Sequence, residues 1–413
     1  MLQRGSDGIE RHLMLDADRA AVDPSGPASP SRASELRFLA FYLPQFHPIP
    51  ENDEWWGPGF TDWANVARAR PVVRGQYQPH VPADLGFYDL RLAEARAAQA
   101  AMAAEYGIDG FCYYHYWFDG RRLLERPFDA VLHSGLPDFP FCLCWANENW
   151  TRSWNGRDGD VLVRQTYSER DDLTHIRWLA EAFSDPRYLR IRGRPLFLVY
   201  RAASIPEAAR TTDTWRRESV RLGVGDPYLC LVHSFDADRL DPGPLGFDAA
   251  VKFAPDWRIL RQLNGSRARR GSRRVFHPRS PYRVNTLRDY SSLVADSLCE
   301  PTPDYRLYPC VSPGFDNTPR RPTGATVLLN SSPDSYETWL RETVGRFEPF
   351  GPEENLVFVN AWNEWAEGNH LEPCQRWGRA YLEAHARVVA DLRSAFRQPT
   401  STASDPATAS LGS

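Results

Sequence analysis

The chain of 413 residues is 42% hydrophobic and 13% aromatic, enough to bury a real core in one large domain or two ordinary ones. Its formal net charge of -4 gives no reason to expect nucleic acid or an acidic membrane surface as a partner. These properties argue against a basic nucleic-acid-binding protein and do not by themselves decide the fold.

Both ends of the chain differ in composition from its middle. Residues 1–34 and 397–413 are low-complexity and polar, and predict disordered tails that flank one folded domain over residues 35–396. The N-terminal stretch lacks the apolar segment of a signal peptide, and no run approaches membrane-spanning length. Seven Cys without metal-ligand spacing favour small core residues in a reducing compartment. We therefore expect a cytoplasmic protein, whose oligomeric state the sequence does not indicate.

Eight short apolar runs bounded by turn residues are predicted to be strands. In chain order they span residues 36–46, 110–117, 139–146, 195–200, 228–234, 249–254, 305–312 and 356–362. Helical periodicity separates most of them, over residues 89–106, 123–134, 171–183, 208–222, 290–299, 335–347 and 376–396. Continuous apolar strands alternating with helices indicate a parallel sheet, and eight of them indicate a single (β/α)₈ TIM barrel. An open doubly wound sheet is the alternative, but no Gly-rich phosphate loop follows the first strand.

Polar and aromatic residues collect where these runs end, whereas the loops at the opposite ends are short and plain. In a TIM barrel the C-terminal ends of the strands and the loops after them build the site. Many of the fourteen Trp lie there beside Asn, Asp and Gly, a setting that favours sugar binding. The predicted substrate-binding residues are Tyr42, Gln45, His47, Trp55, Trp56, Asp62, Trp63, Tyr114, His115, Trp117, Trp145, Asn147, Glu148, Trp150, His233, Lys252, Asp316, Asn317, Arg320, Trp362, Asn363 and Trp365.

The run from Asn360 to Asn369 carries the strongest chemical signal. It places two carboxylates, Glu364 and Glu367, three residues apart among Trp and Asn side chains, directly after the last apolar run. Glycosidic chemistry needs paired carboxylates, and indole faces hold sugar rings. Residues three apart on a strand point to opposite faces, so both carboxylates reach one substrate only if the chain turns after Asn363. Glu364 and Glu367 are therefore the predicted catalytic residues.

Several candidates also have a structural interpretation. Glu148 is either a substrate contact or the partner of an Arg such as Arg152. His115 is either a hydrogen-bonded wall residue or a catalytic one. Lys252 is the only Lys in the chain, which favours a functional role such as holding an anionic group.

Two further points concern ligands. Asp316 and Asn317 either bind sugar hydroxyls or cap their loop, and binding is favoured. Four His residues lack the spacing of a metal triad, so neither a metal nor any other cofactor is expected. These residues are His47, His80, His115 and His233.

Five motifs together resemble the WbsX-like family of bacterial surface-polysaccharide gene clusters. They are Phe-Tyr-Leu-Pro-Gln-Phe-His-Pro at 41–48, Trp-Trp-Gly-Pro-Gly-Phe-Thr-Asp-Trp at 55–63, Gly-Phe-Cys-Tyr-Tyr-His-Tyr-Trp at 110–117, Trp-Ala-Asn-Glu-Asn-Trp at 145–150 and Asn-Glu-Trp-Ala-Glu-Gly at 363–368. The resemblance covers roughly residues 36–390. That family was named as a glycosyltransferase, yet it is similar to glycoside hydrolase family 99 (GH99), the endo-α-mannosidases and endo-α-mannanases.

The resemblance to GH99 implies a retaining mechanism without an enzymic nucleophile. One carboxylate deprotonates the sugar's own 2-hydroxyl, which attacks the anomeric carbon and forms a 1,2-anhydro sugar. A carboxylate three residues later protonates the leaving oxygen and then activates water. The resemblance assigns the first role to Glu364 and the second to Glu367.

Three functions remain open at this stage. The leading one is a retaining hydrolase or transglycosylase of an α-linked, mannoside-like surface polysaccharide or its precursor. The second is a sugar-nucleotide-dependent glycosyltransferase, although neither a nucleotide-binding motif nor an Asp pair for a metal is evident. The third is a non-catalytic glycan-binding protein, which would need no paired carboxylates.

Overall fold

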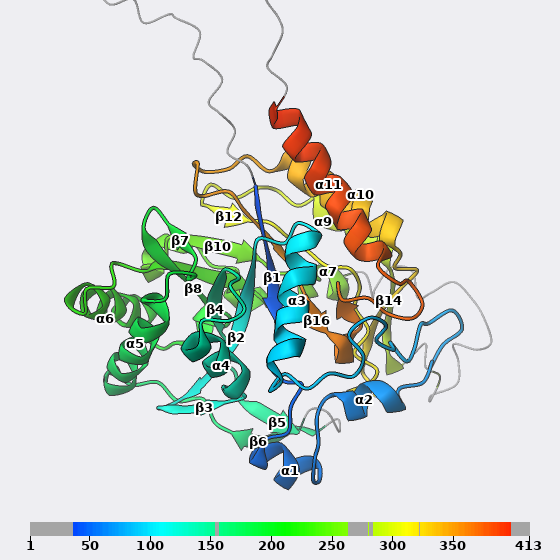
Figure 1. The fold of residues 1–413 in the computed structure, drawn as a ribbon, viewed down its shortest axis with the longest axis horizontal. Coiled ribbons are helices and arrows are strands. Elements are labelled where there is room, and N and C mark those ends of the chain that lie inside the picture. The colour runs from blue at the N-terminus through cyan, green and yellow to red at the C-terminus, as the bar shows by residue number, and fades with distance from the viewer. Residues whose placement is uncertain (1–35, 153–156, 263–279, 281–283, 322, 398–413) are drawn as a thin grey trace, which may run out of the picture. The chain divides into compact units, whose positions relative to one another are not determined.

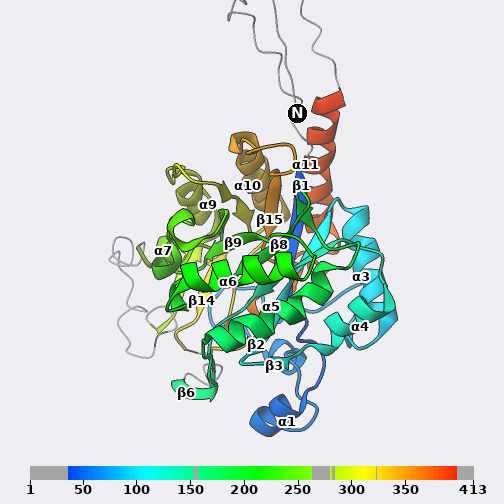
Figure 2. The same ribbon diagram turned by 90° about the vertical axis from the view of Figure 1, so that its left-hand side faces the viewer.

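The computed structural model describes residues 36–152, 157–262, 280, 284–321 and 323–397, which form a nearly closed parallel sheet surrounded by helices (Figures 1 and 2). The predicted N-terminal tail lies outside the described residues, as does the predicted C-terminal tail apart from Arg397. The start of β1 (Arg37–Tyr42) and the end of α11 (Ala380–Arg397) lie on the same side of the barrel (Figures 1 and 2).

Nine strand segments of the described chain follow one another around the sheet in the order β12, β10, β9, β8, β4, β2, β1, β15 and β13. Their bounds are β1 (Arg37–Tyr42), β2 (Gly110–Phe118), β4 (Phe141–Trp145), β8 (Arg194–Val199), β9 (Tyr228–His233), β10 (Ala249–Lys252), β12 (Leu307–Tyr308), β13 (Cys310–Val311) and β15 (Leu356–Val359). β12 and β13 are halves of one apolar run separated by Pro309, which has no N–H to donate. One half pairs with β10 and the other with β15, so eight strands nearly close into a ring.

The prediction of a TIM barrel is confirmed, because each of the eight predicted apolar runs contains one strand of this ring. Every residue of β4, β9 and β15 is buried, as expected for parallel strands that pack on both faces. The first run is the main difference in length. It was predicted to reach residue 46, but the strand ends at Tyr42, and the loop after it turns toward the site.

Helices cover the outside of the sheet (Figure 2), and all seven predicted helices are present. Their bounds are α3 (Ala93–Glu105), α4 (Arg126–Ser134), α5 (Glu169–Phe183), α6 (Ala208–Arg221), α9 (Tyr290–Leu298), α10 (Pro333–Arg346) and α11 (Ala380–Arg397). Ser168 caps α5 by accepting a hydrogen bond of 3.1 Å from the Asp171 N–H. Ser332 caps α10 in the same way, and Pro333 occupies its first turn.

Short elements that the periodicity did not predict lie in the loops. Residues Arg121–Leu123 form β3, which pairs with β2, so α4 begins at Arg126 and not at residue 123. The other additions are α1 (Pro50–Trp56), α2 (Trp63–Arg68), α7 (Trp257–Gln262), β5 (Trp150–Arg152), β6 (Arg157–Val163), β7 (Arg190–Ile191), β11 (Thr286–Asp289), β14 (Thr326–Leu329), β16 (Asn363–Glu364) and β17 (Asn369–His370).

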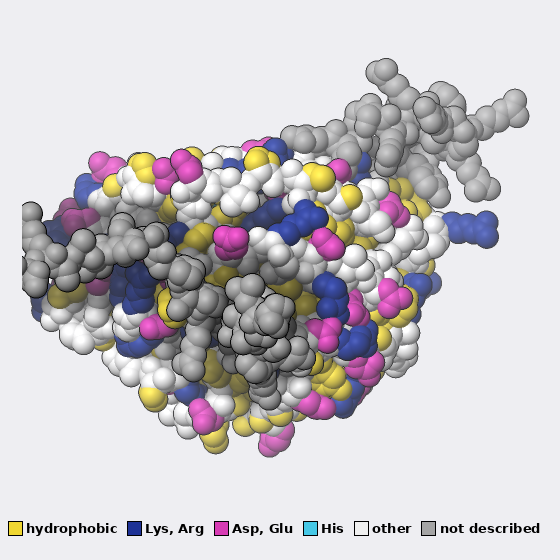
Figure 3. Space-filling view, turned by 90° about the horizontal axis from the view of Figure 1, so that it is seen from above, with side chains coloured by type: hydrophobic (Ala, Val, Ile, Leu, Met, Phe, Trp, Pro, Cys, Tyr) yellow, Lys and Arg dark blue, Asp and Glu magenta, His cyan; other side chains and the backbone are white. Residues whose placement is uncertain are grey.

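The surface and core agree with the composition. Six of the seven Cys are buried and all seven are free thiols, as the interpretation as core residues predicted, while Cys299 is exposed. Acidic and basic side chains are interspersed on the side where the described ends of the chain lie (Figure 3). Among the described residues, no helix combines the length and hydrophobicity needed to cross a membrane.

Candidate active site

The two candidate catalytic glutamates lie on a tight turn beyond β15. β16 pairs with β17 in a two-residue ladder, and a single 3₁₀ turn over Trp365–Glu367 connects them. Gly368 closes the turn with a φ of 56°, in the left-handed region that suits glycine. The chain therefore turns after Asn363, as the spacing of the carboxylates required.

Neighbouring loops hold this turn in place. The Asn363 side chain accepts from the Leu43 N–H at 2.8 Å and donates to the Leu43 carbonyl at 3.0 Å. On the other side, the Asp316 N–H donates to the Glu367 carbonyl at 2.6 Å. The turn is thus tied to the loops after β1 and β13, two strands that flank β15 in the sheet.

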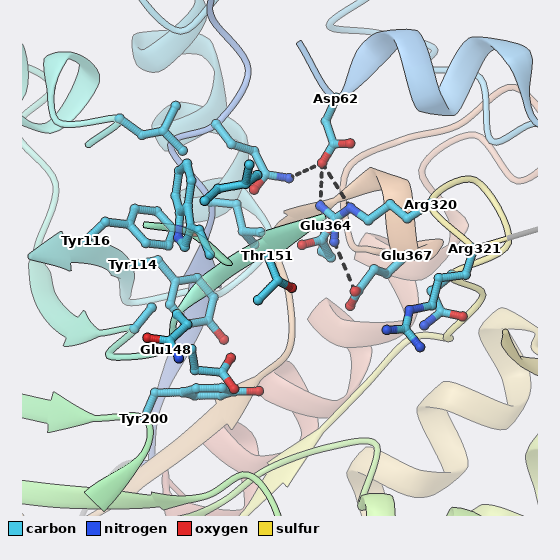
Figure 4. Close-up of a pocket in the computed structure, with 18 of the residues that line it drawn as sticks. Asp62, Tyr114, Tyr116, Glu148, Thr151, Tyr200, Arg320, Arg321, Glu364 and Glu367 are labelled. Carbon is cyan, nitrogen blue, oxygen red and sulfur yellow. Dashed lines mark hydrogen bonds and ion pairs between the residues drawn. The ribbon is translucent and has the colours of Figure 1, made fainter. Parts of the chain in front are cut away.

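Arg320 binds both glutamates at once (Figure 4). Its Nη2 lies 3.0 Å from Glu364 Oε1, and its Nη1 lies 2.9 Å from Glu367 Oε1. The same guanidinium also donates through Nη2 and Nε to Asp62 Oδ2. One buried cation therefore faces three carboxylates from loops far apart in the sequence.

Asp62 is itself held by amides. Gln45 Nε2 donates to Asp62 Oδ2 at 2.6 Å, and Asn65 Nδ2 donates to Oδ1 at 2.8 Å. Both carboxylate oxygens therefore have fixed partners, which keeps Asp62 pointing at Arg320 (Figure 4).

Burial raises the pKa of both Glu364 and Glu367, because the charged carboxylates are removed from water. Arg320 opposes the rise, while the charge of Asp62 adds to it. Arg321 also favours the carboxylate form of Glu367, but two cations do not neutralise three anions, so the cluster favours keeping a proton among its carboxyl groups. Glu364 is buried, whereas the Glu367 side chain is 26% exposed.

Both glutamates open into a cavity of about 580 Å³, the central pocket. Eleven predicted site residues line it: Gln45, Trp55, Trp56, Asp62, Tyr114, Glu148, Trp150, Asn317, Arg320, Glu364 and Glu367. Its wall also holds aromatic and polar side chains that the sequence analysis did not select, namely Asn52, Tyr116, Asn149, Thr151, Tyr200, Phe235, Phe253, Trp257, Phe315, Arg321, Thr326 and Asn360. A concave aromatic wall with a few fixed polar groups suits a sugar.

A family model described as Glycosyltransferase WbsX matches residues 38–385, most of the chain. The chain belongs to the WbsX glycosyltransferase family. Two curated relatives, both called "Uncharacterized protein WxcX", come from two strains of Xanthomonas campestris pv. campestris and are 43% identical over 389 residues. The match covers 94% of this chain and 54% of each relative, so the chain spans about half their length.

Solved structures share the fold of this WbsX-family chain. The GH99 endo-α-mannosidase of Bacteroides thetaiotaomicron is similar with a TM-score of 0.52 at 15% identity, over 87% of this chain and 98% of that one. A "Glycoside hydrolase-like protein" is similar with a TM-score of 0.53 at 13% identity, over 86% and 94%. The resemblance to the WbsX family and to GH99 is thereby confirmed. At these identities the structural likeness shows the fold and not the reaction.

Several predicted site residues of the WbsX-family chain lie behind the central pocket. Alternation along β2 explains two of them: Tyr114 and Tyr116 line the pocket, whereas His115 and Trp117 point outward. His115 stacks on Trp178 of α5 at 4.5 Å between centroids, and Trp117 donates to Asp171 at 2.9 Å. Both therefore fasten α5 to the barrel.

The remaining predicted residues outside the pocket have mainly structural contacts. Tyr42 donates to Gln99 at 2.7 Å, and the Trp63 indole donates to the Tyr88 carbonyl at 2.8 Å. Asp316 instead accepts from Thr318 and Gln76, which fits the capping interpretation of its loop. The others that do not line the central pocket are His47, Trp145, Asn147, His233, Lys252, Trp362, Asn363 and Trp365.

Two charged candidates have ion-pair partners that the sequence did not reveal. Glu148 pairs with Arg201 at 2.6 Å, and not with Arg152, whose guanidinium lies over the Trp56 ring. Lys252 pairs with Glu300 at 2.9 Å and donates to a backbone carbonyl of α9, and burial lowers its pKa to about 8.

Proposed function

We propose that the protein is a retaining glycoside hydrolase, or a transglycosylase using the same intermediate, that cleaves an α-linked, mannoside-like bacterial surface polysaccharide or its precursor. One observation carries the proposal: Glu364 and Glu367 share one pocket wall and are bound by the same guanidinium, Arg320. The pocket's aromatic lining supports a sugar as the ligand.

In the first step, Glu364 takes the proton of the sugar 2-hydroxyl, and the freed oxygen bonds to the anomeric carbon. The bond from that carbon to the glycosidic oxygen breaks, and Glu367 gives its proton to the leaving oxygen. A 1,2-anhydro sugar results. The order of the roles follows the resemblance to GH99, and Arg320 donates to both glutamates and so favours the carboxylate form that each takes during the reaction.

In the second step, Glu367 is ionised and takes a proton from water, or from the hydroxyl of another sugar. The oxygen of that acceptor bonds to the anomeric carbon, and the three-membered ring opens as its oxygen recovers the proton from Glu364. Two inversions leave the configuration unchanged. The more exposed position of Glu367 suits the group that meets the leaving oxygen and the incoming acceptor.

Burial raises the pKa of both glutamates, so the pair can retain the proton that an acid must give, while the shifts themselves do not say which glutamate holds it. A general acid at neutral pH needs a raised pKa, and burial raises the pKa of Glu367. Asp62 shares Arg320 with the pair, so the guanidinium is not wholly available to hold both glutamates ionised. The resting pair can thus hold one proton.

A glycosyltransferase is the second candidate, because the family to which the chain belongs carries that name. It predicts that a sugar nucleotide raises the melting temperature while no oligosaccharide does. The hydrolase proposal predicts the reverse result. We also propose that the enzyme acts in the cytoplasm on a glycan precursor, which cell fractionation tests.

The decisive experiment is a screen of defined α-linked oligosaccharides with the anomeric configuration of the first product read by NMR. We expect the configuration to be retained. Glu364→Gln and Glu367→Gln should each lower kcat/KM by a factor of at least about 10³, because each removes a group that transfers a proton. Glu348 is exposed and does not line the pocket, so Glu348→Gln is the matched control and should leave the rate unchanged. Undiminished cleavage by either site variant would refute the assignment.

A further inference from the structure

A second cavity adjoins the central pocket. This polar compartment has a volume of about 470 Å³ and shares the lining residues Glu148, Asn149, Thr151 and Arg321 with the central pocket. Glu148 and Arg321 stand on different sides of the space in Figure 4, with Thr151 between them. A ligand longer than one sugar unit can therefore extend from one cavity into the other.

The floor of the polar compartment is fixed by hydrogen bonds. Asn147 is buried, accepts from the Arg201 N–H at 2.8 Å and donates to the Arg201 carbonyl at 2.9 Å. It also donates to the Tyr167 hydroxyl at 3.1 Å. The loops after β4, β6 and β8 are thereby joined before any ligand binds, which lowers the ordering cost of binding.

The charges around the compartment are balanced. Arg201 pairs with Glu148 at 2.6 Å and with the buried Asp238 at 2.7 Å. Arg321 is electrostatically coupled to Glu367, whose carboxylate form it favours. Two guanidiniums, Arg201 and Arg321, and two carboxylates, Glu148 and Asp238, surround the compartment, so their formal charges sum to zero.

The lining also differs in kind from that of the central pocket. Apart from the Tyr167 ring, it consists of amide, hydroxyl, carboxylate and guanidinium side chains. Such groups bind the hydroxyl edges of a sugar rather than its faces. The compartment approaches the catalytic pair from the Glu367 side, because Arg321, which lines both cavities, lies beside Glu367 in Figure 4.

We propose that the polar compartment binds the neutral sugar unit on the leaving-group side of the scissile bond. This inference rests on the proposed function, in which Glu367 protonates the leaving oxygen. The aromatic central pocket then holds the ring that reacts, and the polar compartment holds the next unit by its hydroxyl edges. The enzyme accordingly binds at least two sugar units of a neutral glycan, one in each cavity.

A nucleoside diphosphate is the rival occupant, because a glycosyltransferase would place its leaving group at the same position. A diphosphate needs unneutralised cations or free backbone N–H groups. The charges around the compartment sum to zero and do not provide the positive potential that a diphosphate needs. A neutral sugar needs no such potential. The identity of the occupant therefore also separates the two candidate functions.

Ser204 offers a way to plug the compartment without touching the proposed catalytic groups. It is exposed on the rim, at the end of the 3₁₀ turn Ala202–Ser204. Ala203 is the matched control, because it is the exposed neighbour and does not line the compartment. The test compares Ser204→Trp, Ala203→Trp and wild type on p-nitrophenyl α-mannoside and on α-linked mannooligosaccharides of two to five units.

We expect Ser204→Trp to lower kcat/KM for the oligosaccharides by at least about tenfold and to change the aryl glycoside rate less than twofold. Ala203→Trp should change neither. An equal loss on both substrates, or no loss on either, overturns the proposal.

Calorimetric binding of the same oligosaccharides separates this inference from the proposed reaction. If nothing is cleaved but the gain in affinity with chain length disappears in Ser204→Trp alone, the compartment is supported and the hydrolase is not. If UDP or GDP binds wild type and not Ser204→Trp, the compartment holds a diphosphate and the inference is wrong.

Discussion

The Trp365 indole, in the turn between Glu364 and Glu367, donates a hydrogen bond of 2.6 Å to the Glu372 carboxylate. Gln99 and Tyr88 also donate to Glu372, at 2.7 Å and 2.8 Å. Tyr88 in turn contacts Asn363, which braces the turn against the loop after β1. The buried Glu372 carboxylate therefore connects the turn that carries the candidate catalytic residues to Gln99 and Tyr88 through hydrogen bonds.

We predict that Glu372→Gln lowers the free energy of unfolding by about 1–3 kcal/mol, because the amide nitrogen cannot accept and leaves one buried donor unpaired. Urea denaturation measures the change. Glu348→Gln, at an exposed site without this network, should stay within about 0.5 kcal/mol of wild type. Equal stability of the two variants would mean that the three hydrogen bonds contribute nothing net.

The same residue predicts a pH dependence of stability. Burial raises the pKa of Glu372 to about 7, above its ordinary value, despite the hydrogen bonds that oppose the shift. The folded protein then binds more protons than the unfolded chain between the two values. Protonation of Glu372 therefore stabilises the folded state at low pH, and this stabilisation is lost as the pH rises from about 4.5 to about 7.

Melting temperatures of wild type and Glu372→Gln across that range check this prediction. Wild type should lose stability relative to the variant as the pH rises. A constant difference between the two proteins would contradict the raised pKa.

The barrel was predictable because parallel strands buried on both faces leave unbroken apolar runs in the sequence. The turn after Asn363 followed from the need to bring Glu364 and Glu367 together. By contrast, the sequence placed His115 and Trp117 at the site beside Tyr114 and passed over Tyr116. Strand alternation separates the two faces but does not say which one is inward.

The sequence also could not predict ion pairs between loops that are far apart along the chain. Arg201 follows β8, yet it pairs with Glu148 after β4, because these strands are neighbours in the sheet. Tyr200, which also follows β8, lines the central pocket although the sequence analysis did not select it. Trp362 and Trp365 were predicted to bind substrate, but both are buried outside the pocket lining.

Arg320 and Asp62 are predicted to shift the pH optimum in opposite directions. Arg320→Met removes the cation that stabilises ionised Glu364 and Glu367, so both pKa values rise and the optimum of kcat/KM moves to higher pH. Asp62→Asn removes a neighbouring negative charge, so the optimum moves to lower pH. Profiles of kcat/KM against pH measure both shifts, and two shifts in the same direction would disprove this electrostatic account.

Two glycines with nearly the same φ angle test whether the turn that carries Glu364 and Glu367 tolerates displacement. Gly368 has a φ of 56° and Gly378 a φ of 53°, so an Ala at either position adopts the left-handed region at a cost of about 1–2 kcal/mol. A Cβ at Gly368 would also lie 3.0 Å from His80 Nε2, whereas one at Gly378 meets nothing within 4 Å. Gly368→Ala should therefore destabilise the protein more than Gly378→Ala and alone lower kcat, because the shifted turn misplaces Glu367. Chemical denaturation and initial rates measure both effects, and equal losses of kcat in the two variants would show that crowding by His80 does not position the turn.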